Sequence, residues 1–412
     1  MKVAVLSDMH IGLEAKAQDL CPLCLVDENN QVKFAGKQKD YLDRFLSFLE
    51  KENLKADYLL IPGDMTESAH PEEVSLASKA LIRIREKLEV PENNMVYVPG
   101  NHDVDWAILD PKDSTMTRWR HRYMALNESQ FIFDSINRHG ISNGDLLQNN
   151  YFNVWEYKDF IVLGYNSAST DKKGEKVHHG DIVIDHVKAM EDVLKTMDLS
   201  NDRRIKVCLL HHHLRNYPLP TPVNYDPSTA NNGERLIDLL LDYNFDLIVH
   251  GHRHHSFLDT GKDIPILCAG SFSATIESCW EGLVFNQFHL VDMVKDACQS
   301  TRARGHVYSW LNTAAGWRKS YVLPDRCILG PQSPFGVSLK RHQEVSERLK
   351  TYISRNLGPR NVISWKDHVL SNIPELSFIT EDIETIICWC RENMPDVVVK
   401  QDSRAVIEFT RK

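Results

Sequence analysis

Five short apolar segments of the chain each end in a turn that carries Asp, Asn or His. The segment 96–98, for example, is followed by a Pro-Gly turn and then by Asn101, His102 and Asp103. Apolar runs of this length that stop at glycine or proline are typical of buried β-strands. In open α/β sheets, ligands bind outside the carboxyl ends of the strands. We therefore expect one site built from the polar residues that follow these strands: Asp8, His10, Asp64, Asn101, His102, His211, His252 and His254.

The order of the apolar segments predicts an α/β fold. Strands expected at residues 2–6, 57–61 and 96–98 are separated by helices expected at 37–53 and 71–88. This alternation is typical of a sheet with parallel strands. The pattern continues with helices at 118–137, 182–197 and 234–243, and with strands at 151–157, 160–164, 205–210, 246–249, 264–268, 283–291 and a pair within 304–323.

Composition narrows the class of protein. A chain of 412 residues is long enough for two or three domains, and its net charge of −9 argues against general coating of nucleic acid. The N-terminus has no signal-peptide pattern and no apolar stretch is long enough to span a bilayer, so we expect a cytoplasmic protein. Nine scattered cysteines do not resemble a disulfide framework. Cys21 and Cys24 lack a well-spaced second pair, which disfavours a structural zinc site.

The residue types at the strand ends indicate a centre for two metal ions. Carboxylate, amide and imidazole ligands together suit Mn, Fe or Zn better than Mg or Ca, and we expect Mn. The seven candidate ligands are too many for one ion and about right for two. Asp64 stands alone on its turn and is the natural carboxylate to bridge both ions. Asp8 and His10 have the same two-residue spacing as His252 and His254, so each pair can turn towards one ion.

The motifs together resemble those of the calcineurin-like metallophosphoesterase family. Their order within residues 1 to about 255 is Asp8-x-His10, Gly63-Asp64, Gly100-Asn101-His102-Asp103, His211 and Gly251-His252-x-His254. The resemblance implies a four-layer α/β/β/α sandwich with both metals at the strand ends. It also implies one ion held by Asp8, His10 and His254, a second held by Asn101, His211 and His252, and a bridge through Asp64.

One ligand in this set stays open. Residues 211–213 are three consecutive histidines, and the family pattern of His-His followed by proline is broken because Leu214 follows His213. We favour His211 over His212 as the ligand because His211 directly follows the expected strand.

The resemblance implies a phosphoester hydrolase. We expect a phosphodiesterase that cleaves nucleotide or nucleic-acid phosphodiesters through attack of a hydroxide that bridges the two ions. His102 would face the substrate and serve the leaving group, and Asp103 would orient His102 from behind. Arg253 and Arg215 are candidate contacts for an anionic substrate. A phosphomonoesterase or protein phosphatase of the same fold is the alternative, ranked lower because no Arg adjoins Asp64 or Asn101.

The last part of the chain changes character near residue 329. A stretch rich in proline and glycine predicts a boundary there, with a phosphoesterase domain at residues 1–328 and a small, mostly helical accessory region at 329–412. Helices are expected at 338–356, which is basic, and near 381–392, which is acidic. Two solvated faces that pair with each other are the simplest interpretation. The alternative is that this region is a docking module for a protein or nucleic-acid partner. A further alternative, for the whole protein, is a catalytically idle scaffold that acts through this region.

Overall fold

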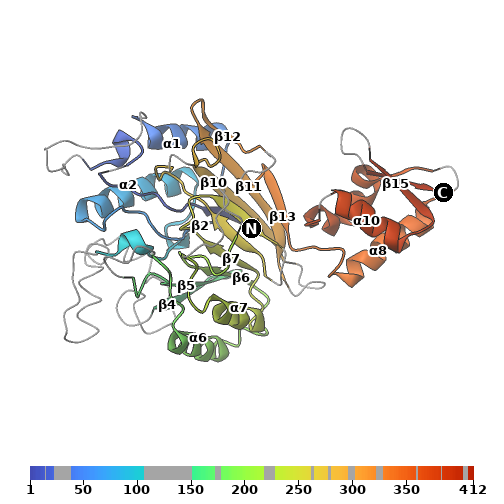
Figure 1. The fold of residues 1–412 in the computed structure, drawn as a ribbon, viewed down its shortest axis with the longest axis horizontal. Helices are drawn as coiled ribbons and strands as arrows, with labels where there is room; N and C mark the ends of the chain where they lie inside the picture. Colours follow the sequence, from blue (N-terminus) through green and yellow to red (C-terminus); the bar gives the residue numbers. More distant parts are fainter. Residues whose placement is uncertain are drawn as a thin grey trace. The chain divides into compact units, whose positions relative to one another are not determined.

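The chain forms two compact units, residues 1–303 with 307–333 and residues 304–306 with 334–412 (Figure 1). The helix expected at 118–137 and Cys24 lie outside the described residues. The computed structural model describes residues 1–13, 15–22, 39–105, 151–171, 178–217, 228–260, 264–276, 280–295, 302–321, 328–358, 361–381, 383–401 and 407–412.

The first sheet of the larger unit has the strand order β12-β11-β10-β1-β2-β3, and β13 also pairs with β11. Its centre is parallel, because β1 pairs with β2 and β2 with β3 in the same direction, whereas β10 runs antiparallel to β1. The strands are β1 (Lys2–Val5), β2 (Tyr58–Ile61), β3 (Met95–Tyr97), β10 (Gln287–Val294), β11 (Arg304–Thr313), β12 (Gly316–Lys319) and β13 (Gln332–Phe335).

The second sheet has the order β4-β5-β6-β7-β9-β8. Its four central strands, β5, β6, β7 and β9, are parallel, and an antiparallel strand closes each edge. β6 and β7 are buried along their whole length, as expected for strands covered on both faces. The strands are β4 (Phe152–Glu156), β5 (Phe160–Tyr165), β6 (Ile205–Leu209), β7 (Leu247–His250), β8 (Ser256–Asp259) and β9 (Ile266–Ala269).

Helices cover the outer faces of the two sheets. α1 (Tyr41–Lys51) and α2 (Pro71–Lys87) lie on one side of the unit, and α6 (Ile184–Thr196) and α7 (Gly233–Asp242) lie on the other, with the sheets between them (Figure 1). Side chains of α6 and α7 share one apolar core with the second sheet. This arrangement confirms the predicted α/β sandwich and brings the carboxyl ends of β1, β2, β3, β6 and β7 into one region.

The smaller unit contains two long helices, α8 (Gln343–Asn356) and α10 (Ile383–Asn393). It also contains an antiparallel sheet in the order β14-β16-β15, which the sequence analysis did not predict. Its strands are β14 (Ile363–Ser364), β15 (Val397–Gln401) and β16 (Ile407–Arg411). Arg348 of α8 forms an ion pair of 2.7 Å with Glu375, so basic and acidic segments of this unit do pair with each other.

Within the described part of the chain, no helix combines the length and the apolar character that crossing a bilayer requires.

Packing of α1 onto the first sheet gives a stability prediction. The buried ring of Phe45 contacts the rings of Phe272, Phe288 and Trp317 at centroid distances of 4.8–5.1 Å. Phe45→Ala should lower the free energy of unfolding of the larger unit by about 3–5 kcal/mol, because it leaves a cavity among aromatic rings. Ser47→Ala on the exposed face of the same helix should change it by less than about 0.5 kcal/mol. Urea titrations of both variants would measure the difference, and equal effects would contradict this packing.

Candidate metal centre

The expected site residues converge where the carboxyl ends of both sheets meet. Asp8 and His10 follow β1, Asp64 follows β2, and Asn101 follows β3, all from the first sheet. His211, which follows β6, comes from the second sheet. His252 and His254 follow β7 in the second sheet. The site therefore lies between the two sheets, and each sheet supplies some of its side chains.

One group of atoms gathers around Asp8. Nε2 of His254 lies 3.3 Å from Oδ1 of Asp8, and Nε2 of His10 lies 3.1 Å from Nε2 of His254. Nε2 of His10 also lies 3.6 Å from Oδ2 of Asp64. The Asp8 carboxylate is held in place by the Ser7 hydroxyl and by the backbone N–H of His252.

A second group gathers around Asn101. Its Oδ1 atom lies 3.0 Å from Nε2 of His211 and 3.2 Å from Nδ1 of His252. Nε2 of His211 in turn lies 3.1 Å from Oδ2 of Asp64. The same oxygen of Asp64 therefore faces both groups, which is the arrangement expected of a bridging carboxylate.

The hydrogen-bonding pattern of His211 shows why this cluster suits a cation. Its Nδ1 lies 2.8 Å from the carbonyl oxygen of Pro62, which can only accept, so Nδ1 carries the proton. In the neutral ring Nε2 is then an acceptor, yet it faces two further acceptors, Asn101 Oδ1 and Asp64 Oδ2. Three buried acceptors at contact distance repel one another unless a positive charge lies among them. A divalent ion supplies such a charge, and the donor set fits one.

The pKa values of the cluster also favour cation binding. Burial lowers the pKa of His10 and of His252 well below the usual range, so both rings are neutral at pH 7, the form that binds metals. Burial opposes ionisation of Asp64, but His211 and His102 hold the pKa of this carboxyl well below its usual range. Burial likewise opposes the charged form of His211, yet the charge of Asp64 raises the pKa of His211 to about 9. A cation is therefore favoured at this position, whether proton or metal.

The backbone at the site is unusual for residues other than glycine. Asp8, His10, Asp64, His252 and His254 all have left-handed backbone conformations, with φ between 48° and 71°. Such conformations are costly for these residue types and tend to be found at functional sites.

Two glycines leave room for the ligand carboxylates. A Cβ atom on Gly100 would overlap Oδ1 and the backbone nitrogen of Asp64, and one on Gly251 would overlap the Asp8 carboxylate and the Ser7 hydroxyl. The sequence analysis did not assign these glycines a contact with particular carboxylates.

His102 lies beside the cluster, and Asp103 is held by the loops around it. Nδ1 of His102 donates to the carbonyl oxygen of Glu67 at 2.8 Å, so Glu67 orients the ring. The Asp103 carboxylate is buried and accepts hydrogen bonds from the backbone N–H and hydroxyl of Thr66 and from the N–H of Gly100. Asp103 therefore fixes the two loops that carry Asp64 and Asn101.

The two arginines differ in their surroundings. Nε of Arg215 donates to Oε1 of Glu234 at 3.0 Å, and Nη2 of Arg215 donates to Oε2 of Glu234 at 3.1 Å. Arg215 thus forms a two-point ion pair with Glu234 and stays a proposed substrate contact. Arg253 lies between His252 and His254 in the sequence, and its Nη1 donates to the hydroxyl of Ser228 at 3.0 Å. It stays a proposed substrate contact.

His212 also lies beside the cluster. His212 is fully buried, its Nδ1 lies 2.9 Å from the hydroxyl of Ser167, and its ring centroid lies 4.5 Å from that of His252. His212 is thus a direct neighbour of the cluster, while the shared contact with Asp64 Oδ2 belongs to His211.

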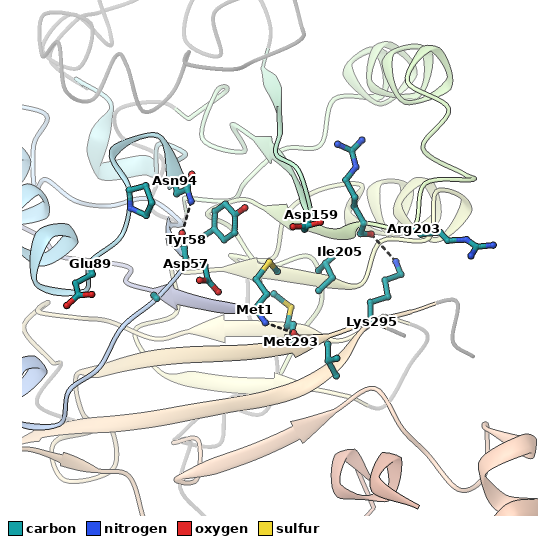
Figure 2. Close-up of a pocket in the computed structure, with 14 residues that line it drawn as sticks. Met1, Asp57, Tyr58, Glu89, Asn94, Asp159, Arg203, Ile205, Met293 and Lys295 are labelled. Carbon is teal, nitrogen blue, oxygen red and sulfur yellow. Dashed lines mark hydrogen bonds between the residues drawn. The ribbon is translucent and has the colours of Figure 1, made fainter. Parts of the chain in front are cut away.

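A cavity lies at the amino ends of the parallel strands, opposite the metal-centre residues. Figure 2 shows this cavity of about 850 Å³, lined by residues at the start of β2, β5 and β6, among them Tyr58, Asp159 and Ile205. Lys295 at its edge is anchored by the Asp246 carboxylate at 2.9 Å and the carbonyl of Arg204 at 3.1 Å. None of the expected site residues lines this cavity, so the two features are separate.

A comparison with protein families agrees with this geometry. The model of the family described as calcineurin-like phosphoesterase matches residues 1–256, which include all the residues of both groups. This chain belongs to the calcineurin-like phosphoesterase family. The family assignment and the His and Asp groups together indicate a metal-binding hydrolase of phosphoric esters. No curated protein sequence matches the chain.

Solved structures show distant similarity to the chain. A Vps29 single mutant from Entamoeba histolytica is 11% identical, with 82% of this chain and 100% of that chain covered and a TM-score of 0.34. GAP50 of Plasmodium, described as the anchor in the inner membrane complex, is 12% identical, with 82% and 89% covered and a TM-score of 0.36. A provisional 5′-nucleotidase from Staphylococcus aureus is 12% identical, with 100% and 70% covered and a TM-score of 0.37. Similarity at this level extends no activity of these proteins to this chain.

The packing of Gly100 against Asp64 gives a prediction about metal binding. Gly100→Ala should weaken binding of Mn²⁺ by roughly 10- to 100-fold, the range for disturbed outer contacts of a metal site, because the added methyl group displaces the Asp64 carboxylate. The control is Gly358→Ala in the smaller unit, where the added methyl group would meet only the side chain of Asn361. Equilibrium dialysis with elemental analysis would measure both, and unchanged affinity in Gly100→Ala would contradict a ligand role for Asp64.

Proposed function

We propose that this protein is a two-metal phosphodiesterase that acts on nucleotide or nucleic-acid phosphodiesters. The observation that carries the proposal is that one oxygen of Asp64 faces two groups of ligand atoms at the meeting point of the sheets. In this proposal Asp8, His10 and His254 hold one ion, Asn101, His211 and His252 hold the other, and Asp64 bridges them. Mn is the proposed metal, with Fe or Zn as alternatives.

The bound ions would supply Lewis acidity, both to acidify water and to neutralise charge on the phosphoryl oxygens. The chain's own part is to hold these ligands rigidly. Asp8 is fixed by Ser7 and by the N–H of His252, and His211 is fixed by the Pro62 carbonyl. Preorganised ligands of this kind reduce the reorganisation needed in the transition state.

His102 is the proposed proton carrier for the leaving group. Its Nδ1 is committed to the Glu67 carbonyl, and its ring lies edge to face with His10 at a centroid distance of 4.6 Å. Its backbone N–H donates to Oδ1 of Asp64 at 2.8 Å, which ties the residue to the bridging carboxylate. Nε2 is therefore the nitrogen that would carry the second proton of the protonated ring and give it to a departing alkoxide.

The charge around the site favours a diester over a monoester. A phosphodiester carries one negative charge at neutral pH, whereas a phosphomonoester carries nearly two. Arg253 and Arg215 are the proposed substrate contacts, and Arg215 also pairs with Glu234. A site with this limited cationic side-chain charge suits the monoanion.

We further propose that residues 1–328 carry the hydrolase and that residues 329–412 form an accessory region for a protein partner. Deletion of residues 334–412 tests this division. Hydrolysis should persist while partner binding is lost, and unchanged partner binding would refute the accessory role.

Removal of the bridging carboxylate gives the first test of the mechanism. Asp64→Ala should abolish hydrolysis of bis-p-nitrophenyl phosphate in the presence of Mn²⁺ and should lower the metal content, because both groups lose a shared ligand. Release of p-nitrophenol and elemental analysis measure the two effects. A wild-type sample that holds two metals and yet fails to hydrolyse simple diesters would overturn the proposed activity.

Replacement of His102 gives the second test. His102→Gln should lower kcat by roughly 10²- to 10⁴-fold, the usual contribution of a general acid, with the metal content unchanged. His342→Gln in the smaller unit is the matched control and should behave as the wild type does. Loss of metal from His102→Gln would instead place His102 among the ligands.

A further inference from the structure

The carboxylate of Glu73 is buried beside the loop that precedes helix α2. Glu73 lies in the first turn of that helix, and only 2% of the residue is exposed. Its Oε2 atom accepts hydrogen bonds from the backbone N–H of Ser68, at 2.8 Å, and of His70, at 3.2 Å. Burial raises the pKa of this carboxyl to about 7, and the two donors offset part of the cost of its charge.

Only one of these two bonds is explained by helix capping. His70 is the N-cap of α2, and a Glu at the third helical position commonly accepts from the N-cap N–H. Ser68 lies two residues before the N-cap, outside the helix. The bond from Ser68 therefore connects Glu73 to a peptide group that the helix itself does not need to satisfy.

That peptide group also contacts His102. The N–H of Ser68 and the carbonyl of Glu67 belong to the same peptide group, and this carbonyl accepts from Nδ1 of His102 at 2.8 Å. Because a peptide group is planar and trans, its N–H and C=O point in opposite directions and move as one body. A carboxylate on the N–H also polarises the C=O and strengthens it as an acceptor. Glu73 and His102 are thus joined through a single peptide group.

The loop around this peptide group is anchored on its other side as well. The N–H and hydroxyl of Thr66 donate to Oδ1 of Asp103, at 3.0 and 2.9 Å, and the N–H of Glu67 donates to the carbonyl of Ile11 at 3.1 Å. The bond between Ser68 and Glu73 completes the anchoring on the helix side.

We propose that Glu73 is a positioning residue for His102 and acts through the peptide group between Glu67 and Ser68. By holding that carbonyl in place, Glu73 keeps a proton on Nδ1 of His102, so that Nε2 is the nitrogen that gains and loses the second proton of the ring. The ring itself lies beside His10 and Asp64. The inference rests on the proposed function, in which Nε2 of His102 serves the leaving group. Its effect on the ring, however, can be measured without any turnover.

The first measurement is nuclear magnetic resonance of the full-length protein labelled with ¹⁵N-histidine and loaded with Zn²⁺. The His102 signals are identified by their absence in His102→Gln. At a pH that leaves the ring neutral, the wild type should show the remaining proton of His102 on Nδ1. Glu73→Ala should show a mixture of both tautomers, and Glu73→Gln, which keeps an acceptor but loses the charge, should show a smaller shift of the Nδ1 resonance.

The second measurement is the kinetics of bis-p-nitrophenyl phosphate hydrolysis with Mn²⁺. Glu73→Ala should lower kcat by roughly 10- to 100-fold, as the loss of an outer hydrogen-bond partner does at other metal sites, with KM and metal content unchanged. Glu73→Gln should recover most of this loss. The matched control is Glu72→Gln, which removes the same charge from the same helical turn at a side chain that is 45% exposed and pairs with His70.

The outcomes separate the two proposals. If Glu73→Ala and Glu73→Gln fold and leave the His102 resonances as in the wild type, Glu73 only caps the helix and the inference is overturned. If Glu73→Ala does not fold, Glu73→Gln decides alone, because its Nδ1 resonance must still move. A tautomer change in a protein whose wild type shows no hydrolysis would support the link between Glu73 and His102 while refuting the proposed function.

Discussion

The carboxylate of Asp64 is the point on which the rest of the site depends. It is buried where the two sheets meet, and one of its oxygens faces His10 from the first sheet and His211 from the second. Its other oxygen accepts the backbone N–H of His102. A buried anion is tolerated only when donors or cations surround it. The two sheets must therefore pack with their carboxyl ends in register, because any slip would leave this charge without its partners.

Much of this arrangement could be predicted from the sequence because strands and turns are local features. The apolar runs before Asp8, Asp64, Asn101, His211 and His252 identified the strands, and the turns that follow placed the polar groups at the same edge of each sheet. The parallel order of the central strands then brought distant parts of the chain together. The short strands β8 and β13 and the sheet of the smaller unit were missed, since edge strands of a few residues have weak periodicity.

Contacts that depend on tertiary packing were not predicted. The ring of His102 donates to the backbone carbonyl of Glu67, and a backbone group has no residue-type signal. Arg215 pairs with Glu234 on α7. Neither partner could be assigned from spacing, because each comes from a different loop or helix.

The left-handed backbone at Asp8, His10, Asp64, His252 and His254 has a consequence for how this fold can change over time. Each such residue costs roughly 1–3 kcal/mol, a cost that glycine and, in part, asparagine avoid. Replacing a ligand by glycine would relieve strain in the same step that destroys metal binding. Backbone strain at the ligand positions therefore subtracts from the stability of the scaffold. A descendant that lost its ligands one by one would keep the sandwich intact and remain available for a purely structural role.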